Sequence, residues 1–541
     1  MVTKYDVIVI GAGPNGLTVA AYLSKAGLKV LVLERRHEAG GGLATEEVTI
    51  GGFMHNTHAL YFMMVDYSPV YKDLELERIY GLRHIYPSLQ FAMPLSDGRA
   101  LCIYSDVDKT CESIAKFSRK DADAYRQLYQ KCQRYTDGFL APATFVRPIS
   151  AIDQAAKLYR SELGSELMEF TEKSPREMIT DIFENEHVRT MMLYISCMWG
   201  LEPEGHGVSY LVPLYINRSA NYRLIAGGSH GLAQALQKVL LENKGMISCN
   251  QRIKRIIVRE GTAKGVEMED GTVIEAAKAV VSTLDPVQTF INLVGEEYLD
   301  KDFVEGIKIW KWDKTSLFDV HMALEEPPNF IAAASEPDFN KAFIYVIGYE
   351  TTDDFVNQLK AIDRGELLDN AGFNCCFPTV HDPLQAPPGR HTGVISQLSP
   401  YALKEGAEMW YDYNFKQAQA ERCIKTLHKY APNITEDKIM QTYFSTPIDI
   451  ENKLRDMVRG SIKQGAYHPL QMGYLRPHQD VSRNRTSIKN LYVGGASCHP
   501  GGLVILGPGY VAAHTVMEDW GMERPFPESQ CVAAARGKGL L

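Results

Sequence analysis

The sequence predicts an α/β fold, because similar element orders begin and end the chain around a mostly helical stretch. Near the N-terminus a β-branched run at residues 6–10 leads into a glycine-rich turn and an apolar helix. Residues 490–493 form a second short apolar run, followed by glycines and a helix expected from Tyr510. Residues 106–218 have the spacing of amphipathic helices. A chain of 541 residues predicts two or three domains.

The N-terminal turn, residues 11–16, has the glycine spacing of a dinucleotide-binding unit. Gly11 makes the tight turn, Gly13 allows backbone to approach a pyrophosphate, and Gly16 allows close packing of helix on strand. Pro14 and Asn15 lie between these glycines and belong to the same predicted site. The next strand, residues 30–33, ends at an acidic residue, Glu34, that can accept hydrogen bonds from a ribose. A dinucleotide site is therefore predicted, with phosphates at the start of the helix.

A second glycine-rich segment follows this unit directly. Gly40, Gly41 and Gly42, with Leu43, predict neither helix nor strand, and they permit close approach of backbone to a ligand. The alternative is a flexible surface loop. Because of its position we interpret the segment as a second wall of the cofactor site.

Composition narrows the class of protein. The net charge of −9 argues against a nucleic-acid partner. The ten cysteines form no CxxC pair and no zinc-ligand pattern, so we expect no metal and reduced thiols. We expect no signal peptide, since only residues 1–5 precede the first strand, and no apolar stretch long enough to cross a bilayer. We therefore expect a cytoplasmic protein. Peripheral contact with the inner face of a membrane is compatible with these features.

The middle of the chain alternates between two predicted domains. The dinucleotide-binding domain takes residues 1–105, 219–288 and 481–530; the second domain takes residues 106–218 and 289–480; residues 531–541 form a tail. Within the first domain, the turn at residues 269–271 predicts a hairpin, and residues 279–283 a further buried strand. The Met-rich residues 191–199 suit either a core or a pocket for a large apolar ligand.

Five segments of the chain together resemble the phytoene desaturase family of FAD-dependent oxidoreductases, within the larger group that includes amine oxidases and glutathione reductase. The matching segments are residues 11–34, 40–41, 227–256, 386–391 and 491–513. The resemblance implies a Rossmann-type FAD-binding domain with a discontinuous α+β substrate domain. It also implies FAD as the cofactor.

The resemblance assigns roles by position. The first glycines would hold the FAD pyrophosphate and Glu34 the adenosine ribose, the backbone at Ile253 would hold the adenine, and residues 494–509 would line the isoalloxazine ring. The cofactor-binding residues implied are Gly11, Gly13, Pro14, Asn15, Gly16, Glu34, Arg35, Gly40, Gly41, Gly42, Leu43, Ile253, Thr283, Gly494, Gly495, Gly502, Leu503 and Val504.

Two departures from the family pattern affect these roles. Many members carry arginine where this chain has Gly42, so phosphate neutralisation must depend on Arg35, Arg36 or backbone amides. Leu503 and Leu506 replace small residues, and their bulk would reshape the substrate face of the flavin. The amine-oxidase branch commonly has an acidic residue near Gly495, and its absence here favours the desaturase branch.

The flavin of such an enzyme takes a hydride from an activated C–H bond. Tyr61 is a candidate aromatic residue for stabilising positive charge on the substrate. His499 and His58 are the candidates for proton transfer. The alternative for both histidines is a hydrogen-bonded residue that holds a loop.

The resulting hypothesis is an FAD-dependent dehydrogenase or desaturase acting on a lipophilic isoprenoid or terpene. The outcomes left open are desaturation, allylic dehydrogenation with water capture, and isomerisation. Electrons would pass to a quinone or an electron-transfer protein, and a homo- or hetero-oligomer is allowed. The alternatives are an amine or alcohol oxidase on the same fold, and a non-catalytic FAD-bearing subunit of a heteromeric dehydrogenase.

Overall fold

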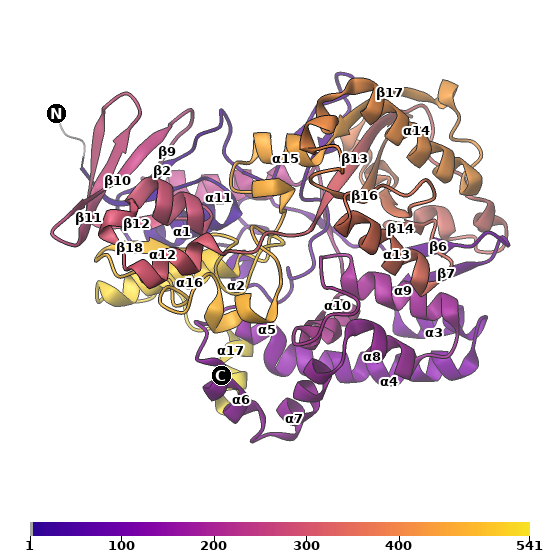
Figure 1. The fold of residues 1–541 in the computed structure, drawn as a ribbon, viewed down its shortest axis with the longest axis horizontal. Coiled ribbons are helices and arrows are strands. Elements are labelled where there is room, and N and C mark those ends of the chain that lie inside the picture. Colours follow the sequence, from indigo (N-terminus) through magenta and orange to yellow (C-terminus); the bar gives the residue numbers. More distant parts are fainter. Residues whose placement is uncertain (1–3) are drawn as a thin grey trace.

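The structure is a computed structural model and describes residues 4–541. It contains two seven-stranded sheets that lie side by side, with a layer of helices beneath the second sheet (Figure 1). The first sheet has the order β10-β11-β12-β1-β2-β9, with β18 beside β12, and the second has the order β17-β13-β16-β15-β14-β6-β7.

The first sheet is parallel at its centre. Strand β1 lies between β2 and β12 and is parallel to both, while β10 and β11 form an antiparallel hairpin. Its strands are β1 (Lys4–Ile10), β2 (Val30–Leu33), β9 (Met246–Ser248), β10 (Ile253–Arg259), β11 (Thr262–Met268), β12 (Val273–Ser282) and β18 (Leu491–Val493). The hairpin prediction at residues 269–271 is confirmed. Residues 273–282 form one continuous strand instead of the two segments expected, because its first half pairs with both β1 and β11.

Both faces of this sheet are covered, which explains the apolar runs in its strands. Val7 and Val9 of β1 pack on one face with α1 (Pro14–Lys25), α11 (His230–Glu242) and α16 (Gly507–Asp519). Ile8 and Ile10 alternate to the other face, with the β10–β11 hairpin. Helix α16 begins at Gly507, three residues before the expected Tyr510, because Pro508 suits a first turn as well as a loop.

The second sheet combines segments from distant parts of the chain. Its strands are β6 (Leu89–Pro94), β7 (Ala100–Tyr104), β13 (Thr315–Leu324), β14 (Ile344–Ile347), β15 (Phe373–Cys376), β16 (His391–Pro400) and β17 (Ile439–Ser445). Strand β6 is parallel to β14 and pairs with β7. Residues 89–104 therefore belong to the second sheet. The chain passes from the first sheet to the second before residue 89, whereas the sequence placed the domain boundary at residue 105.

Helices cover the second sheet on both sides. The helical prediction for residues 106–218 is confirmed by α3 (Val107–Ala115), α4 (Arg119–Tyr135), α5 (Ala141–Ala143), α6 (Ala151–Leu158), α7 (Glu162–Glu169), α8 (Pro175–Ile182), α9 (Glu186–Cys197) and α10 (Val212–Arg218). The other helices are α2 (Pro69–Asp73), α12 (Lys301–Lys308), α13 (Thr352–Asp363), α14 (Tyr413–Tyr430), α15 (Pro447–Lys453) and α17 (Gln530–Gly537). Four two-residue strands pair locally: β3 (Thr45–Glu46) with β4 (His55–Asn56), and β5 (His84–Ile85) with β8 (Leu224–Ile225).

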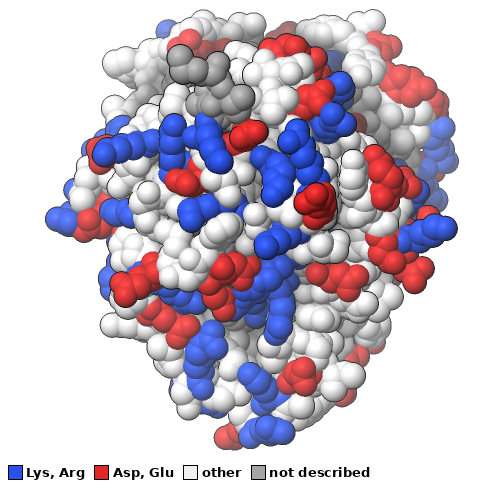
Figure 2. Space-filling model, turned by 90° about the vertical axis from the view of Figure 1, so that its left-hand side faces the viewer, with Lys and Arg blue, Asp and Glu red and all other residues white. Residues whose placement is uncertain are grey.

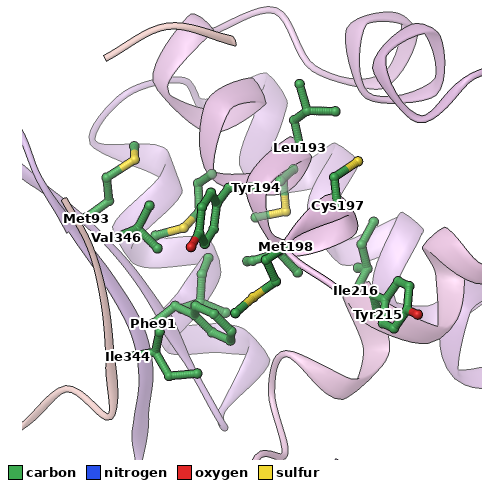
Figure 3. Packing of buried hydrophobic residues seen from close by; sticks show 14 of the residues in the cluster. Phe91, Met93, Leu193, Tyr194, Cys197, Met198, Tyr215, Ile216, Ile344 and Val346 are labelled. Carbon is green, nitrogen blue, oxygen red and sulfur yellow. The ribbon is translucent and has the colours of Figure 1, made fainter. Parts of the chain in front are cut away.

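The Met-rich segment lies mainly in the core. Tyr194 and Met198, on and just after α9, point toward Phe91 and Ile344 of the sheet (Figure 3). Met191 and Met192 are fully buried, so the core interpretation holds for most of the segment. Only its end, Met198 and Trp199, reaches a cavity.

The cysteines, the lengths of the helices and the surface charges bear on the predictions made from composition. All ten cysteines are free, and the neighbours Cys375 and Cys376 pack on opposite faces of the second sheet. Within residues 4–541, no helix combines the length and apolar character needed to span a bilayer. On the face formed by the first sheet, basic and acidic side chains are interspersed (Figure 2), as in the pairing of Lys254 and Arg255 with Glu267.

Candidate functional site

A cavity of about 550 Å³ runs from the first sheet to the second. One end, here called the cofactor end, lies at the carboxyl ends of β1 and β2. The opposite end, here called the far end, lies against β13, β15 and β16. Predicted residues that line the cavity are Gly11, Gly13, Pro14, Asn15, Gly16, Glu34, Arg35, Gly41, Gly42, His58, Tyr61, Ile253, Thr283, Gly502, Leu503 and Val504.

The glycines of the first turn have different structural roles. A Cβ on Gly16 would overlap the carbonyl oxygen of Gly11, so Gly16 is required for α1 to pack on β1. A Cβ on Gly13 would meet no atom of the described residues within 4 Å, although Gly13 lines the cavity. Gly13 is also the N-cap of α1 and leaves the first amides of that helix without a side-chain acceptor. Open space beside free helix amides suits a diphosphate.

Glu34 is held in place by backbone amides. Its Oε2 accepts from the amide of Ala12 and its Oε1 from the amide of Arg36, each at 2.8 Å. Each carboxylate oxygen keeps a second lone pair, so Glu34 can still accept from the hydroxyls of a ribose. The arrangement suits the role that its position predicted.

The second glycine segment lies on top of the first turn. A Cβ on Gly41 would come within 2.9 Å of the Cα of Gly13, so only glycine allows this approach. Gly40 and Leu43 lie behind the cavity wall: the Gly40 amide donates to Ala12 at 2.8 Å, and the Leu43 carbonyl accepts from His230 at 3.0 Å. They hold the wall in position, while Gly41 and Gly42 line the cavity.

Cationic groups near the glycines come from a distant part of the chain. Lys453, at the end of α15, lines the cavity and donates to Thr57 at 2.8 Å and to Glu46. Burial opposes ionisation of Glu46, but hydrogen bonds from Lys453 and Thr57 outweigh it and lower its pKa to about 2. Arg35 is tied to the same helix, since it donates to the Lys453 carbonyl at 3.2 Å. Lys453 thus supplies positive charge near Gly42, where the family pattern has arginine.

Two glycines near the C-terminus, Gly494 and Gly495, serve the packing of the first sheet and do not line the cavity. A Cβ on Gly495 would overlap the carbonyl oxygen of Thr283, and one on Gly494 would come within 2.6 Å of Ala512. Neither residue is part of the cavity lining; both allow β18, β12 and α16 to meet behind the wall. Thr283 lines the cavity and donates to the Ile10 carbonyl at 2.8 Å.

The segment that follows is strained. Leu503, Val504 and Leu506 have φ values of 69°, 53° and 62°, in the left-handed region that bulky residues rarely adopt. Gly502 lies against Lys463, whose Cα would be 2.9 Å from a Cβ at Gly502. Strain of this kind persists only where surrounding contacts enforce it, and it concentrates at functional sites.

Polar residues form a row across three strands at the far end. Asp319 on β13 is opposite Ser396 on β16, which is opposite Asn374 on β15. Asn374 accepts from the Tyr61 hydroxyl at 3.2 Å and donates to the Tyr194 hydroxyl at 3.0 Å. Tyr61 is thereby fixed at the cavity wall.

Asp319 is the one acidic member of this row. It is 5% exposed, and its Oδ1 has no hydrogen-bond partner among residues 4–541. Burial raises its pKa to about 7, against the opposing effect of the Ser396 hydroxyl. A carboxyl group with this pKa can hold or release a proton near neutral pH.

The predicted proton carriers lie in different places. His58 lines the cavity, and its Nε2 has no hydrogen-bond partner in the part of the chain that the structure describes. Burial together with the charge of Lys453 lowers the pKa of His58 to about 3. His499 lines a separate cavity on the other side of Leu503 and donates to the Ala143 carbonyl at 3.0 Å. Burial lowers the pKa of His499 to about 4, so both imidazoles are neutral at pH 7.

Sequence reasoning missed Asp319, Asn374 and Lys453. Asp319 is an acidic residue inside the apolar run of β13, and that isolated position was the available signal. Asn374 and Lys453 approach the cavity only through strand register and the placement of α15, which no local pattern indicates.

Comparison with known proteins identifies relatives along the whole chain. The profile of the family described as "Flavin containing amine oxidoreductase" matches residues 15–505. The chain is 40% identical to a limonene dehydrogenase subunit of Castellaniella defragrans over 553 aligned residues, covering 100% of this chain and 99% of the relative. It is 22% identical to a 4,4'-diapophytoene desaturase of Methylomonas, over 93% of this chain and 92% of the relative.

Solved structures share the fold at lower identity. Putrescine oxidase bound to putrescine superimposes with a TM-score of 0.59 at 16% identity, over 96% of this chain and 99% of that one. Cyclohexylamine oxidase from Brevibacterium oxydans gives a TM-score of 0.58 at 14% identity, with the same coverage. These comparisons confirm the expected fold class, the resemblance and the flavin cofactor.

Proposed function

The chain belongs to the flavin containing amine oxidoreductase family, and we propose that it is a dehydrogenase that removes hydride from a C–H bond of a lipophilic terpene. The full-length similarity to a limonene dehydrogenase subunit carries this proposal. The amine oxidases among the solved structures share only the fold, so they do not favour an amine as substrate.

The cofactor end has the groups that FAD requires. The open space at Gly13, the free amides of α1 and the fixed carboxylate of Glu34 suit the pyrophosphate and the ribose. FAD, when bound, supplies the acceptor for the hydride. Leu503 and Val504 lie where the predicted ring-lining segment reaches the cavity and would shape the substrate side.

The far end would bind the apolar body of the substrate and exclude water. Its apolar residues include Met198, Leu317, Val394 and Leu398. The rings of Tyr61 and Trp199, with centroids 6.1 Å apart, can stabilise positive charge left on carbon when a hydride departs.

Asp319 would receive the proton that balances this reaction. In desaturation, a neighbouring C–H bond breaks, its electrons form the double bond, and its proton passes to the Asp319 carboxylate. In water capture, water forms a C–O bond with the cationic carbon and gives its proton to the same carboxylate. A pKa of about 7 suits either step.

Product analysis tests the reaction. The FAD-loaded protein is incubated anaerobically with limonene and an artificial electron acceptor in ¹⁸O-labelled water. We expect a labelled alcohol if water is captured, or an unlabelled product with an additional double bond if Asp319 removes a carbon-bound proton. Oxidation of putrescine with no terpene product would instead support the amine-oxidase alternative.

The electron acceptor and partner belong to the same proposal. The related dehydrogenase is named as a subunit, which favours a heteromeric assembly in which this chain is one member. We propose a quinone or an electron-transfer protein as acceptor, and peripheral contact on the inner face of a membrane, where quinone and substrate are both available. A chain that binds FAD but needs a second subunit for turnover would fit the alternative of a non-catalytic subunit.

A further inference from the structure

We propose that the second cavity, behind Leu503, is a holding chamber for an uncharged terpene-sized molecule, which passes to the flavin cavity between Met63 and Leu503. The identity of this molecule rests on the proposed function. The ability of the chamber to bind an apolar ligand rests on the geometry alone.

The second cavity has the size and walls of a ligand site. Its volume is about 510 Å³, within the range of about 300–1,000 Å³ that small-molecule sites occupy. Its walls are mainly aliphatic and aromatic, including Leu140, Leu158, Leu167, Leu211, Leu214 and Ile505. Apolar cavities much smaller than this stay dry and take up small apolar molecules.

Few charges reach this chamber. His499 is held by the Ala143 carbonyl and is neutral at pH 7. Arg147 and Arg536 are ion-paired, with Glu518 and Glu528 respectively, and Lys157 is half-buried in the lining. The lining formed by the described residues contains no Asp or Glu, so a cationic ligand would find no carboxylate to replace its hydration, whereas an uncharged hydrocarbon needs no such partner.

The wall between the two cavities is thin. Met63, Gly502 and Leu503 line both of them, so single side chains separate the two spaces. Met63 is unbranched and changes rotamer easily. Leu503 begins the strained left-handed segment, whose conformation is maintained against its own preference. An adaptable side chain beside a strained segment is suited to opening a passage.

The outer wall is formed by parts of the chain that meet at one edge of the molecule. Helices α6, α7 and α17 lie together at the lower edge of Figure 1. Leu540 is buried against Leu158 and Leu167, and Leu541 lines the chamber. On the outside of α6, Ile152 is 83% exposed.

Filling the chamber tests the proposal without requiring turnover. Leu214 lines only the second cavity, and Leu214→Trp would place a larger, rigid ring in it and narrow the space left for a ligand. The probe is N-phenyl-1-naphthylamine, whose fluorescence rises in apolar sites, titrated into the FAD-loaded protein and displaced with limonene. We expect dye affinity about tenfold weaker or worse in Leu214→Trp. Leu241→Trp, the same change at an exposed position of α11, should bind as the unmodified protein does.

The results distinguish a failure of the chamber proposal from a failure of the proposed dehydrogenase function. If Leu214→Trp binds the dye more weakly while its FAD content is unchanged, the second cavity binds an apolar ligand. This conclusion would stand even if no terpene reduced the flavin. Unchanged dye binding in this variant would overturn the proposal, and Leu211→Trp provides the same test if the first variant does not fold. Met63→Phe examines the passage: slower anaerobic flavin reduction by limonene with dye binding retained supports it, and an unchanged rate would contradict it.

Discussion

The two ends of the main cavity are built in different ways. At the cofactor end the ligand surface is mostly backbone, brought close by Gly11, Gly13, Gly16 and Gly41 within one short stretch of sequence. At the far end it is made of side chains on β13, β15 and β16, which strand register aligns. A backbone surface tolerates almost no added atoms, whereas a side-chain surface can be altered without unfolding the protein. The consequences of mutation should therefore differ between the two ends.

The largest effects are expected at the cofactor end. Gly16→Ala places a methyl group on the Gly11 carbonyl and should lower the free energy of unfolding by about 3 kcal/mol or more, with loss of FAD. Gly13→Ala adds its methyl group in open space and should leave the unfolding free energy of the FAD-free protein nearly unchanged while weakening FAD binding. Chemical denaturation and flavin absorbance measure the two effects.

Gly537→Ala is the matched control, since its Cβ also meets nothing within 4 Å and it lies outside the cavity. It should leave FAD binding unchanged and raise the free energy of unfolding by about 1 kcal/mol at most, because Gly537 is a residue of α17. Equal loss of stability in Gly13→Ala and Gly16→Ala would show that the two glycines do not have separate roles.

Asp319→Asn should have the next largest effect, at the far end. If the carboxylate accepts the proton, flavin reduction should slow by about 100-fold or more with FAD binding retained. Activity of the unmodified protein should rise as pH increases through about 7, and the variant should lack this rise. Stopped-flow reduction from pH 5.5 to 8.5 measures both; a variant that keeps the rate and the pH dependence would exclude this role.

The same substitution should change stability in the opposite direction. The pKa of Asp319 is raised from 3.8 when unfolded to about 7 when folded, so the folded state holds the proton more tightly. Proton binding at Asp319 therefore stabilises the folded state. This stabilisation is complete below pH 3.8, and as the pH rises to about 7 the free energy of unfolding falls by about 1.4 kcal/mol per pH unit at most. Asp319→Asn removes this loss and should be more stable than the unmodified protein at pH 8.

A smaller effect is expected for the ion pair of Glu46 with Lys453, beside the cofactor end. Glu46 has a lowered pKa, so the stability it contributes is present above pH 4.5 and is lost as the pH falls to about 2. Glu46→Gln should lower the free energy of unfolding by about 1 kcal/mol at pH 6, because the pair with Lys453 is partly exposed. Glu267→Gln, in a surface ion pair on β11, is the control and should change little. Identical unfolding curves for Glu46→Gln and the unmodified protein at pH 6 would contradict a structural role for this contact.

The smallest effect is expected for His499. It lies in the chamber and outside the main cavity, so His499→Gln should change the rate of flavin reduction by less than about threefold. A loss near 100-fold, of the size expected from general acid–base catalysis, would show that His499 transfers the proton.

The cofactor end is formed by residues close together in the sequence and the far end by residues far apart, and this difference explains what the sequence could predict. The βαβ unit and the positions of its glycines and Glu34 follow from spacing within 34 residues, and the structure contains that unit; the roles of these residues toward FAD stay predictions. Residues 89–104 were assigned to the first domain because no local signal shows that β6 pairs with β14, more than 200 residues away. Asp319 and Lys453 were missed for the same reason: each reaches the cavity through long-range pairing.

An anaerobic titration of the FAD-loaded protein with limonene tests the central claim most directly. We expect the absorption band of oxidised flavin to disappear as limonene is added and to stay unchanged when putrescine is added. Bleaching by putrescine and not by limonene would contradict the account, as would a purified protein that retains no flavin.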